Sequence, residues 1–176
     1  MSFLRANREL MIKDYGNWHV RYNDISLKGV DILARDANTA WVSLFRLDGF
    51  SKLEDSKAAF KPYLVLMSMD KNCIGTYGLK LAEGRFPANE SEAAISVEAM
   101  RMGGLDINIG DKLTLEVGKR FSIASEEQES VELGLDDNYN EPWEGQPETE
   151  ELRLVSAEEV TVVGIIKFVT LFISLK

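Results

Sequence analysis

Cysteine and histidine are scarce in this chain of 176 residues: Cys73 and His19 are the only residues of their kinds. A single cysteine cannot form a disulfide within the chain, and a single histidine cannot build a site with several histidine ligands. The sequence therefore excludes a disulfide framework and a multi-histidine metal centre. Apolar residues are plentiful, at 45%, which is enough to fill one domain of ordinary size or two small subdomains with a shared core.

Positive charge is also scarce. Lysine and arginine number 20 against 29 acidic residues, which gives a net charge of −9 and a pI near 4.7. Proteins that bind nucleic acid cluster basic residues against the phosphates, so this balance argues against a nucleic-acid partner. One segment, residues 126–151, carries the imbalance, because it holds eleven acidic residues and no lysine or arginine.

The composition of residues 126–151 predicts a flexible acidic insertion. Its carboxylates repel one another and few aliphatic side chains are present, which is typical of a solvated loop whose removal the fold survives. Asp136, Asn138 and Asn140 alternate like calcium ligands, but an EF-hand loop needs glycine and glutamate where this chain has Glu141 and Pro147. We therefore predict no metal and no other cofactor. The residues that could contact a partner are Trp143, Asp136, Asp137, Glu141 and Glu144.

Long hydrophobic runs are missing as well. A transmembrane helix needs about 20 apolar residues, whereas the longest run, residues 160–175, is shorter and contains Lys167. The N-terminus carries Arg5, Arg8 and Lys13 and lacks the apolar core of a signal peptide. We expect the chain as given to be soluble.

The spacing of apolar residues predicts short helices and short strands. Residues 2–15 and 27–37 have a helical period, and Asp24 or Ser26 could cap the second helix. Residues 92–102 are helical by propensity and end at a pair of glycines. Residues 71–87, with three spaced glycines and a proline, indicate turns. Runs typical of strands are residues 18–22, 41–47, 63–69, 113–117 and 160–166.

The last two of these strands flank the acidic segment, so we expect them to form the arms of a long hairpin. The predicted fold class is α+β, with a mixed sheet, short helices and a long hairpin that carries an acidic insertion.

The sequence offers little for catalysis. His19 is the one candidate for a general base near neutral pH, and its alternating context predicts a surface or edge-strand residue. Cys73 shows no sign of activation, and neither a phosphate-binding loop nor a Gly-x-Ser-x-Gly turn occurs. Trp41 is expected in the core, whereas Trp143 in the acidic segment could anchor a partner. We therefore predict no catalytic residues and no enzyme activity.

Four stretches, in order along the chain, resemble a known family. Residues 83–96 (EGRFPANESEAAIS) resemble the Gly-Arg-x-Pro-x-Asn-x-x-Glu-hydrophobic signature of MacB-like periplasmic core domains. Residues 105–115 (LDINIGDKLTL) are similar to the Ile-Gly-Asp strand entry of that family, and residues 159–165 (EVTVVGI) to its closing Val-Val-Gly-Ile strand. Residues 16–20 (GNWHV) resemble a strand of FtsX-like ABC transporter permeases from Gram-positive bacteria. The resemblance makes residues 92–96 a strand and leaves residues 97–102 helical.

The resemblance implies a non-catalytic extracytoplasmic domain of an ABC transporter permease, at the extracellular face of a bacterial plasma membrane. Its partners would be a cytoplasmic ATPase subunit, reached through membrane helices that this sequence lacks, and a cationic peptide or cell-envelope protein. The expected parts are a helix or stalk over residues 1–15, the domain over residues 16–166 and a tail over residues 167–176. The alternative is a free-standing secreted or cell-surface module that binds through the acidic loop, and a cytosolic hydrolase is a distant third.

Overall fold

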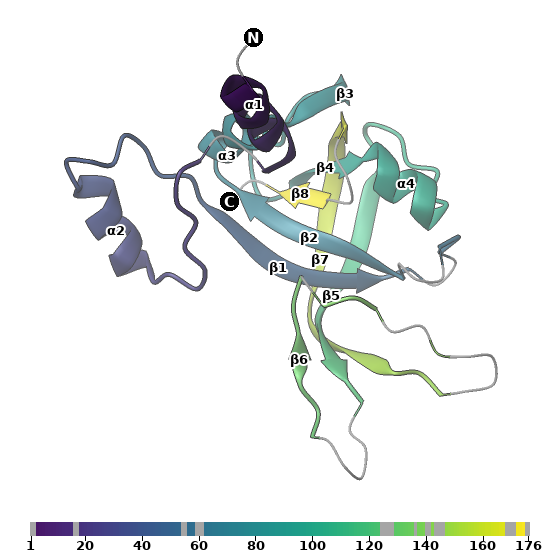
Figure 1. Cartoon of the computed structure of the whole chain (residues 1–176). Helices are drawn as coiled ribbons and strands as arrows, with labels where there is room; N and C mark the ends of the chain where they lie inside the picture. The colour runs from purple at the N-terminus through teal and green to yellow at the C-terminus, as the bar shows by residue number, and fades with distance from the viewer. Residues whose placement is uncertain are drawn as a thin grey trace. The chain divides into compact units, whose positions relative to one another are not determined.

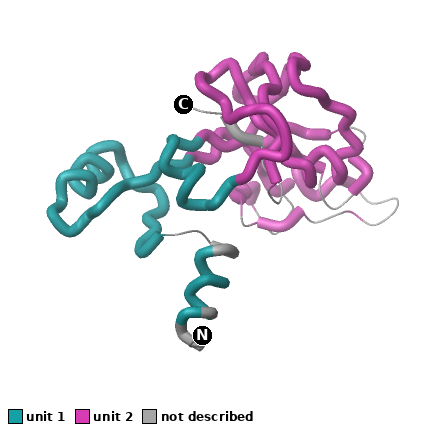
Figure 2. Tube along the Cα trace, turned by 90° about the horizontal axis from the view of Figure 1, so that it is seen from above, with its two compact units in different colours: residues 1–45, 69–79 teal, residues 46–68, 80–176 magenta. Residues whose placement is uncertain are grey.

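The computed structural model describes residues 3–15, 18–53, 56–58, 62–123, 129–135, 137–139, 142, 147–167 and 172–174. The chain forms two compact units (Figure 2). Unit 1 consists of residues 1–45 and 69–79, and unit 2 of residues 46–68 and 80–176. The chain therefore leaves unit 1, returns to it and then completes unit 2.

Unit 1 contains the helices α1 (Phe3–Tyr15), α2 (Leu27–Arg35) and α3 (Lys71–Thr76). The predicted helices over residues 2–15 and 27–37 are thus confirmed to within two residues. Ser26 is the cap of α2, because its hydroxyl oxygen accepts a hydrogen bond from the Gly29 N–H.

Two predictions for unit 1 are wrong. Residues 18–22 form no strand: they follow an irregular path, and the alternating side chains of Trp18, Val20 and Tyr22 stay 37–63% exposed. All five residues line a pocket, so their alternation does not mark the two faces of a strand. Residues 71–87 contain more than turns, because α3 begins behind Asp70, whose carboxylate accepts from the Cys73 N–H.

In the described part of the chain, eight strands form one curled, mixed sheet that makes up most of unit 2, and with the helices they give an α+β fold (Figure 1). The strands are β1 (Phe45–Lys52), β2 (Tyr63–Met69), β3 (Lys80–Gly84), β4 (Glu92–Ser96), β5 (Lys112–Ser122), β6 (Glu132–Leu133), β7 (Glu150–Lys167) and β8 (Phe172–Ser174). The predicted strand over residues 41–47 begins only at Phe45, because hydrogen bonds to α3 hold the residues just before it.

The strand order is β3-β7-β4-β8-β2-β1-β5-β6, with a further pairing of β5 to β7. Strand β4 runs parallel to β7 and β8 runs parallel to β2, whereas the pairs β1–β5, β3–β7, β4–β8, β5–β6 and β5–β7 are antiparallel. Because β5 pairs with β7 as well as with β1, the sheet returns toward its own beginning and curls.

The predicted long hairpin is confirmed: β5 and β7 pair from Lys112↔Thr161 to Ser122↔Glu150. Both strands are longer than expected, and Figure 1 shows their distal part reaching beyond the other strands, with β6 beside it. The acidic segment therefore ends earlier than expected, because Glu150 and Glu151 already belong to β7.

The core of unit 2 is aliphatic. Ile95 and Val162 are fully buried, and Leu64, Leu115 and Val117 pack into the same cluster. Helix α4 (Val97–Gly103) follows β4 directly, as the family resemblance implied, and buries Ala99 in this cluster. It ends at Gly104, which has φ 68°, a left-handed conformation that glycine adopts without a Cβ clash.

Candidate functional site

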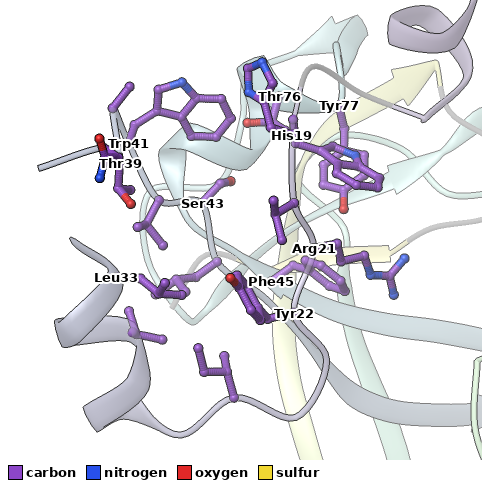
Figure 3. A pocket seen from close by; sticks show the side chains of 18 residues that line it. His19, Arg21, Tyr22, Leu33, Thr39, Trp41, Ser43, Phe45, Thr76 and Tyr77 are labelled. Atoms are coloured by element: carbon purple, nitrogen blue, oxygen red, sulfur yellow. The ribbon is translucent and has the colours of Figure 1, made fainter. Parts of the chain in front are cut away.

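A pocket of about 420 Å³ lies within unit 1 (Figure 3). Three stretches of the chain line it: residues 18–22 with Ile25, residues 38–45, and Thr76 with Tyr77 at the end of α3. Helix α2 adds Val30 and Leu33. In Figure 3, Leu33, Thr39 and Trp41 lie on one side of the pocket, and Arg21, Tyr22 and Tyr77 on the other. The lining is mainly apolar and aromatic, and it includes no aspartate or glutamate.

The Asp70 carboxylate fixes one wall of the pocket. One of its oxygens caps α3, and the other accepts a hydrogen bond of 2.9 Å from the Leu44 N–H. The Asn72 side chain donates to the Val42 carbonyl oxygen, also at 2.9 Å. Residues 42–44 are therefore held against α3 by polar contacts, which leaves their apolar neighbours free to face the pocket.

Aromatic contacts form the base of the pocket. The rings of Phe45 and Tyr77 meet edge to face, with centroids 6.0 Å apart, and the Arg21 guanidinium lies 5.0 Å from the Phe45 centroid. Arg21 also donates through Nε to the Asn23 side-chain oxygen. Burial raises the pKa of Tyr77 and the Arg21 charge opposes this shift, so the phenol stays protonated at neutral pH.

The pocket is open to solvent. Trp41 is 46% exposed, Tyr22 56% and Trp18 37%. The expectation that Trp41 belongs to the core is therefore wrong: the polar contacts of residues 42–44 hold the chain beside it at the surface. Large aromatic side chains that stay exposed around a hollow are typical of contact sites for apolar groups.

The residues considered for catalysis are not arranged for it. His19 is exposed at the pocket lining, as expected for a surface residue. The Cys73 thiol is fully buried and donates to the Leu44 carbonyl oxygen at 2.9 Å. Burial raises its pKa to about 11, so the thiolate that a nucleophile requires is scarce at neutral pH. Among the described residues, no group of three or more potential ligands could hold a metal ion.

Of the predicted contact residues in the acidic segment, only Asp137 lies in the described part of the chain. Asp136, Glu141, Trp143 and Glu144 lie outside the described residues. The Asp137 side chain accepts from the Gly134 N–H at 2.7 Å, and its carbonyl oxygen accepts from Arg120 at 3.0 Å. This part of the segment is therefore folded against unit 2.

Arg120 and Glu150 form a buried ion pair beneath that fold. The Arg120 Nε and Nη2 each lie 2.9 Å from a Glu150 carboxylate oxygen, and the two side chains are 5% and 3% exposed. The guanidinium lies 5.1 Å from the Phe50 ring centroid and 5.2 Å from that of Tyr63. Removal of the whole segment 126–151 would therefore also remove the partner of a buried cation.

Tyr139 extends this cluster outward. Its ring meets Tyr63 edge to face at 6.0 Å, and its hydroxyl donates to Glu148 at 3.0 Å. Burial and Glu148 raise the Tyr139 pKa to about 12, and burial also raises the pKa of Tyr63. The cluster packs the rings of Phe50, Tyr63 and Tyr139 around the ion pair.

The three motif stretches of unit 2 meet at one point of β7. Gly84 pairs with Gly164, the Arg85 N–H donates to the Val163 carbonyl oxygen, and the Gly110 N–H donates to that of Val162. A Cβ at Gly164 would collide with the Arg85 carbonyl oxygen, which explains why glycine is needed there.

Side chains close this junction. The Arg85 guanidinium donates two hydrogen bonds of 2.6 and 2.7 Å to the Glu92 carboxylate, which also accepts from the Ala88 N–H. The Asp111 side chain accepts from the Asn108 N–H at 2.7 Å and so closes the turn before β5. The Arg85 hydrogen bonds, followed by that of Ala88, lower the Glu92 pKa to about 2.

No protein-family model, curated protein or solved structure matches the chain. In the described part of the chain, no helix is long and apolar enough to cross a membrane. The pocket and the Arg120–Glu150 pair were not foreseen from the sequence. The two tryptophans of the pocket were the only local signal for it, and the ion pair joins residues 30 positions apart with no pattern between them.

Proposed function

We propose that the chain is a non-catalytic extracytoplasmic domain of an ABC transporter permease. It contacts a substrate or partner outside the membrane and transmits conformational change to the membrane part, which couples to a cytoplasmic ATPase subunit. The observation that carries this proposal is the junction at β7, where the stretches that resemble MacB-like domains are joined by direct hydrogen bonds.

The residues at this junction suit a mechanical role. Gly84 and Gly164 allow two backbones to approach closely, and the Arg85–Glu92 contact fixes the turn that follows β3. Such groups stiffen a frame, and none of them is placed to take part in proton transfer or nucleophilic attack. A stiff frame is what a domain needs if it transmits displacement.

The aromatic pocket of unit 1 supplies the contact surface in this proposal. Its lining fits an apolar or aromatic group, and it carries Arg21 and His19 but no carboxylate. The acidic segment acts separately, because its charge attracts cationic peptides and raises their association rate. That attraction weakens as salt rises, since exposed charges are screened beyond about 8 Å at physiological ionic strength.

The encoding reading frame gives the first test. We expect apolar helices on both sides of this chain and a neighbouring ATPase gene. In the complete permease, Trp41→Ala should reduce substrate-stimulated ATPase activity while the ATPase subunit still copurifies. Lys71→Gln, an exposed change on α3, is the control. A reading frame without flanking apolar helices would refute the proposal and favour the free-standing binding module.

A further inference from the structure

Half of β7 has an edge without a neighbour. Thr161 pairs with Lys112 of β5 and with Glu92 of β4, so β5 and β4 lie on opposite edges of β7. Strand β5 continues along its edge down to Glu150, whereas β4 pairs only from Thr161 onward. Among the described residues, no strand pairs with the β4 side of residues 150–160, and we call this side the open edge.

The open edge is apolar at its middle. Leu154 is 57% exposed and Val155 70%. An exposed strand edge with unpaired N–H and C=O groups is a template for another strand, and folded proteins usually cover or charge such edges. A second strand at this position would satisfy the backbone groups and bury both side chains.

A bulge at Val155 determines which side chains share a face. Ser156 lies opposite Val117 and Leu154 lies opposite Gly118, so one extra residue of β7 stands between two consecutive residues of β5. The faces of β7 therefore exchange at the bulge. As a result, Arg153 and Glu158 lie on the same face of the sheet although one position is odd and the other even.

This arrangement is complementary to itself. A two-fold axis perpendicular to the sheet pairs two copies of an edge strand in antiparallel orientation. It keeps each face of one copy on the same side as the identical face of the other copy. With the axis through the bulge, Arg153 of each copy lies opposite Glu158 of the second copy, on the same face. Leu154 then lies opposite Ala157, and residues 152–159 fit between the hairpin end and the start of β4.

We propose that the open edge of β7 binds a second copy of this chain, by antiparallel pairing of the two β7 strands about the Val155–Ser156 peptide bond. The observations that select a second copy are the symmetric positions of Arg153 and Glu158 and the apolar pair at the centre. Arg153 now contacts Glu151 at 2.5 Å, donates to the Ser130 hydroxyl oxygen at 3.0 Å and lies 4.0 Å over the Phe121 ring. The Ser130 and Phe121 contacts lie on the β5 side of β7, so the Arg153 side chain has to leave them to meet Glu158 of the second copy.

The expected association is weak, because one pair of strands buries less surface than a permanent interface. Sedimentation velocity at chain concentrations from about 10 µM to about 1 mM should show concentration-dependent dimers. This concentration range covers the dissociation constants expected of small interfaces. Arg153→Glu and Glu158→Arg should each weaken dimerisation about tenfold, since each places two like-charged pairs across the strands. The double variant should dimerise like the original chain, and a mixture of the two single variants should form mixed dimers.

The control is Glu83→Arg, which makes the same charge change on an exposed residue of β3, a strand that pairs with residues 164–167 of β7 and not with residues 150–160. It should dimerise normally, and circular dichroism should show that every variant is folded. Three results would overturn the proposal: a monomer at all concentrations, dimers that both single reversals leave unchanged, or equal weakening by the control. An extended peptide that protects the edge amides of a chain that stays monomeric would also overturn it.

Discussion

Replacement of Glu150 by alanine should destabilise unit 2 strongly, because it leaves the buried Arg120 without its counter-charge. The change frees the guanidinium Nε and Nη2, while Nη1 keeps the Asp137 carbonyl oxygen and the Phe50 and Tyr63 rings stay in place. Loss of one partner of a buried pair costs about 3–5 kcal/mol, and the remaining contacts place this case at the lower end. About 3 kcal/mol corresponds to a fall in Tm of about 6–12 °C in a chain of this size.

Urea denaturation followed by circular dichroism measures this loss. Glu151→Ala is the matched control, because Glu151 is the adjacent residue and makes an exposed pair with Arg153 that contributes at most about 1 kcal/mol. The double variant Arg120→Met with Glu150→Leu should recover most of the stability, because apolar side chains can replace a buried ion pair. If Glu150→Ala and Glu151→Ala lost equal stability, the Arg120–Glu150 pair would not be buried as described.

Three further predictions concern single side chains. The Glu92 pKa is depressed to about 2, so its contact with Arg85 stabilises the fold above the ordinary carboxyl pKa and is lost as pH falls toward about 2; an acid titration of stability should be flatter in Glu92→Gln over this range. Cys73, buried and with its pKa raised to about 11, should react with iodoacetamide at pH 8 much more slowly in the native chain than in urea, and equal rates would contradict its burial. Trp41→Ala should change the free energy of unfolding by less than about 1 kcal/mol, because the side chain is 46% exposed; a larger loss in chemical denaturation would mean that Trp41 is a core residue after all.

The spacing of apolar residues and the capping residues predicted those helices and strands that depend on neighbouring residues alone. Residues 63–69 are apolar in sequence and form β2 with the predicted bounds, and Ser26 and Gly104 delimit helices through their own side chain or backbone freedom. Residues 18–22 alternate in residue type like a strand, but all five line the pocket and none belongs to a strand. Alternation of large apolar and polar residues therefore does not distinguish a sheet from the wall of a pocket.

The site depended on contacts that no local window contains. Asp70 reaches back to Leu44 and thereby shapes the pocket wall, and Arg120 meets Glu150 across the whole acidic segment. The composition of residues 126–151 indicated an unusual segment. Its net charge alone did not indicate that one of its carboxylates, Glu150, pairs with the buried Arg120. Burial of a single glutamate is decided by the strand pairing, which places Ser122 opposite Glu150.

The position of β8 bears on how the chain is made. Residues 172–174 fill the gap between β2 and β4, parallel to one and antiparallel to the other. During synthesis these residues emerge after β2 and β4. The edges of β2 and β4 that face β8 therefore stay unpaired until residues 172–174 have been translated. Contacts of such large sequence separation slow folding, and waiting edges invite association between nascent chains. A ribosome-bound chain that stops before residue 172 should therefore remain open to proteases and chaperones at β2 and β4, and extension of the chain through residue 174 should close the sheet.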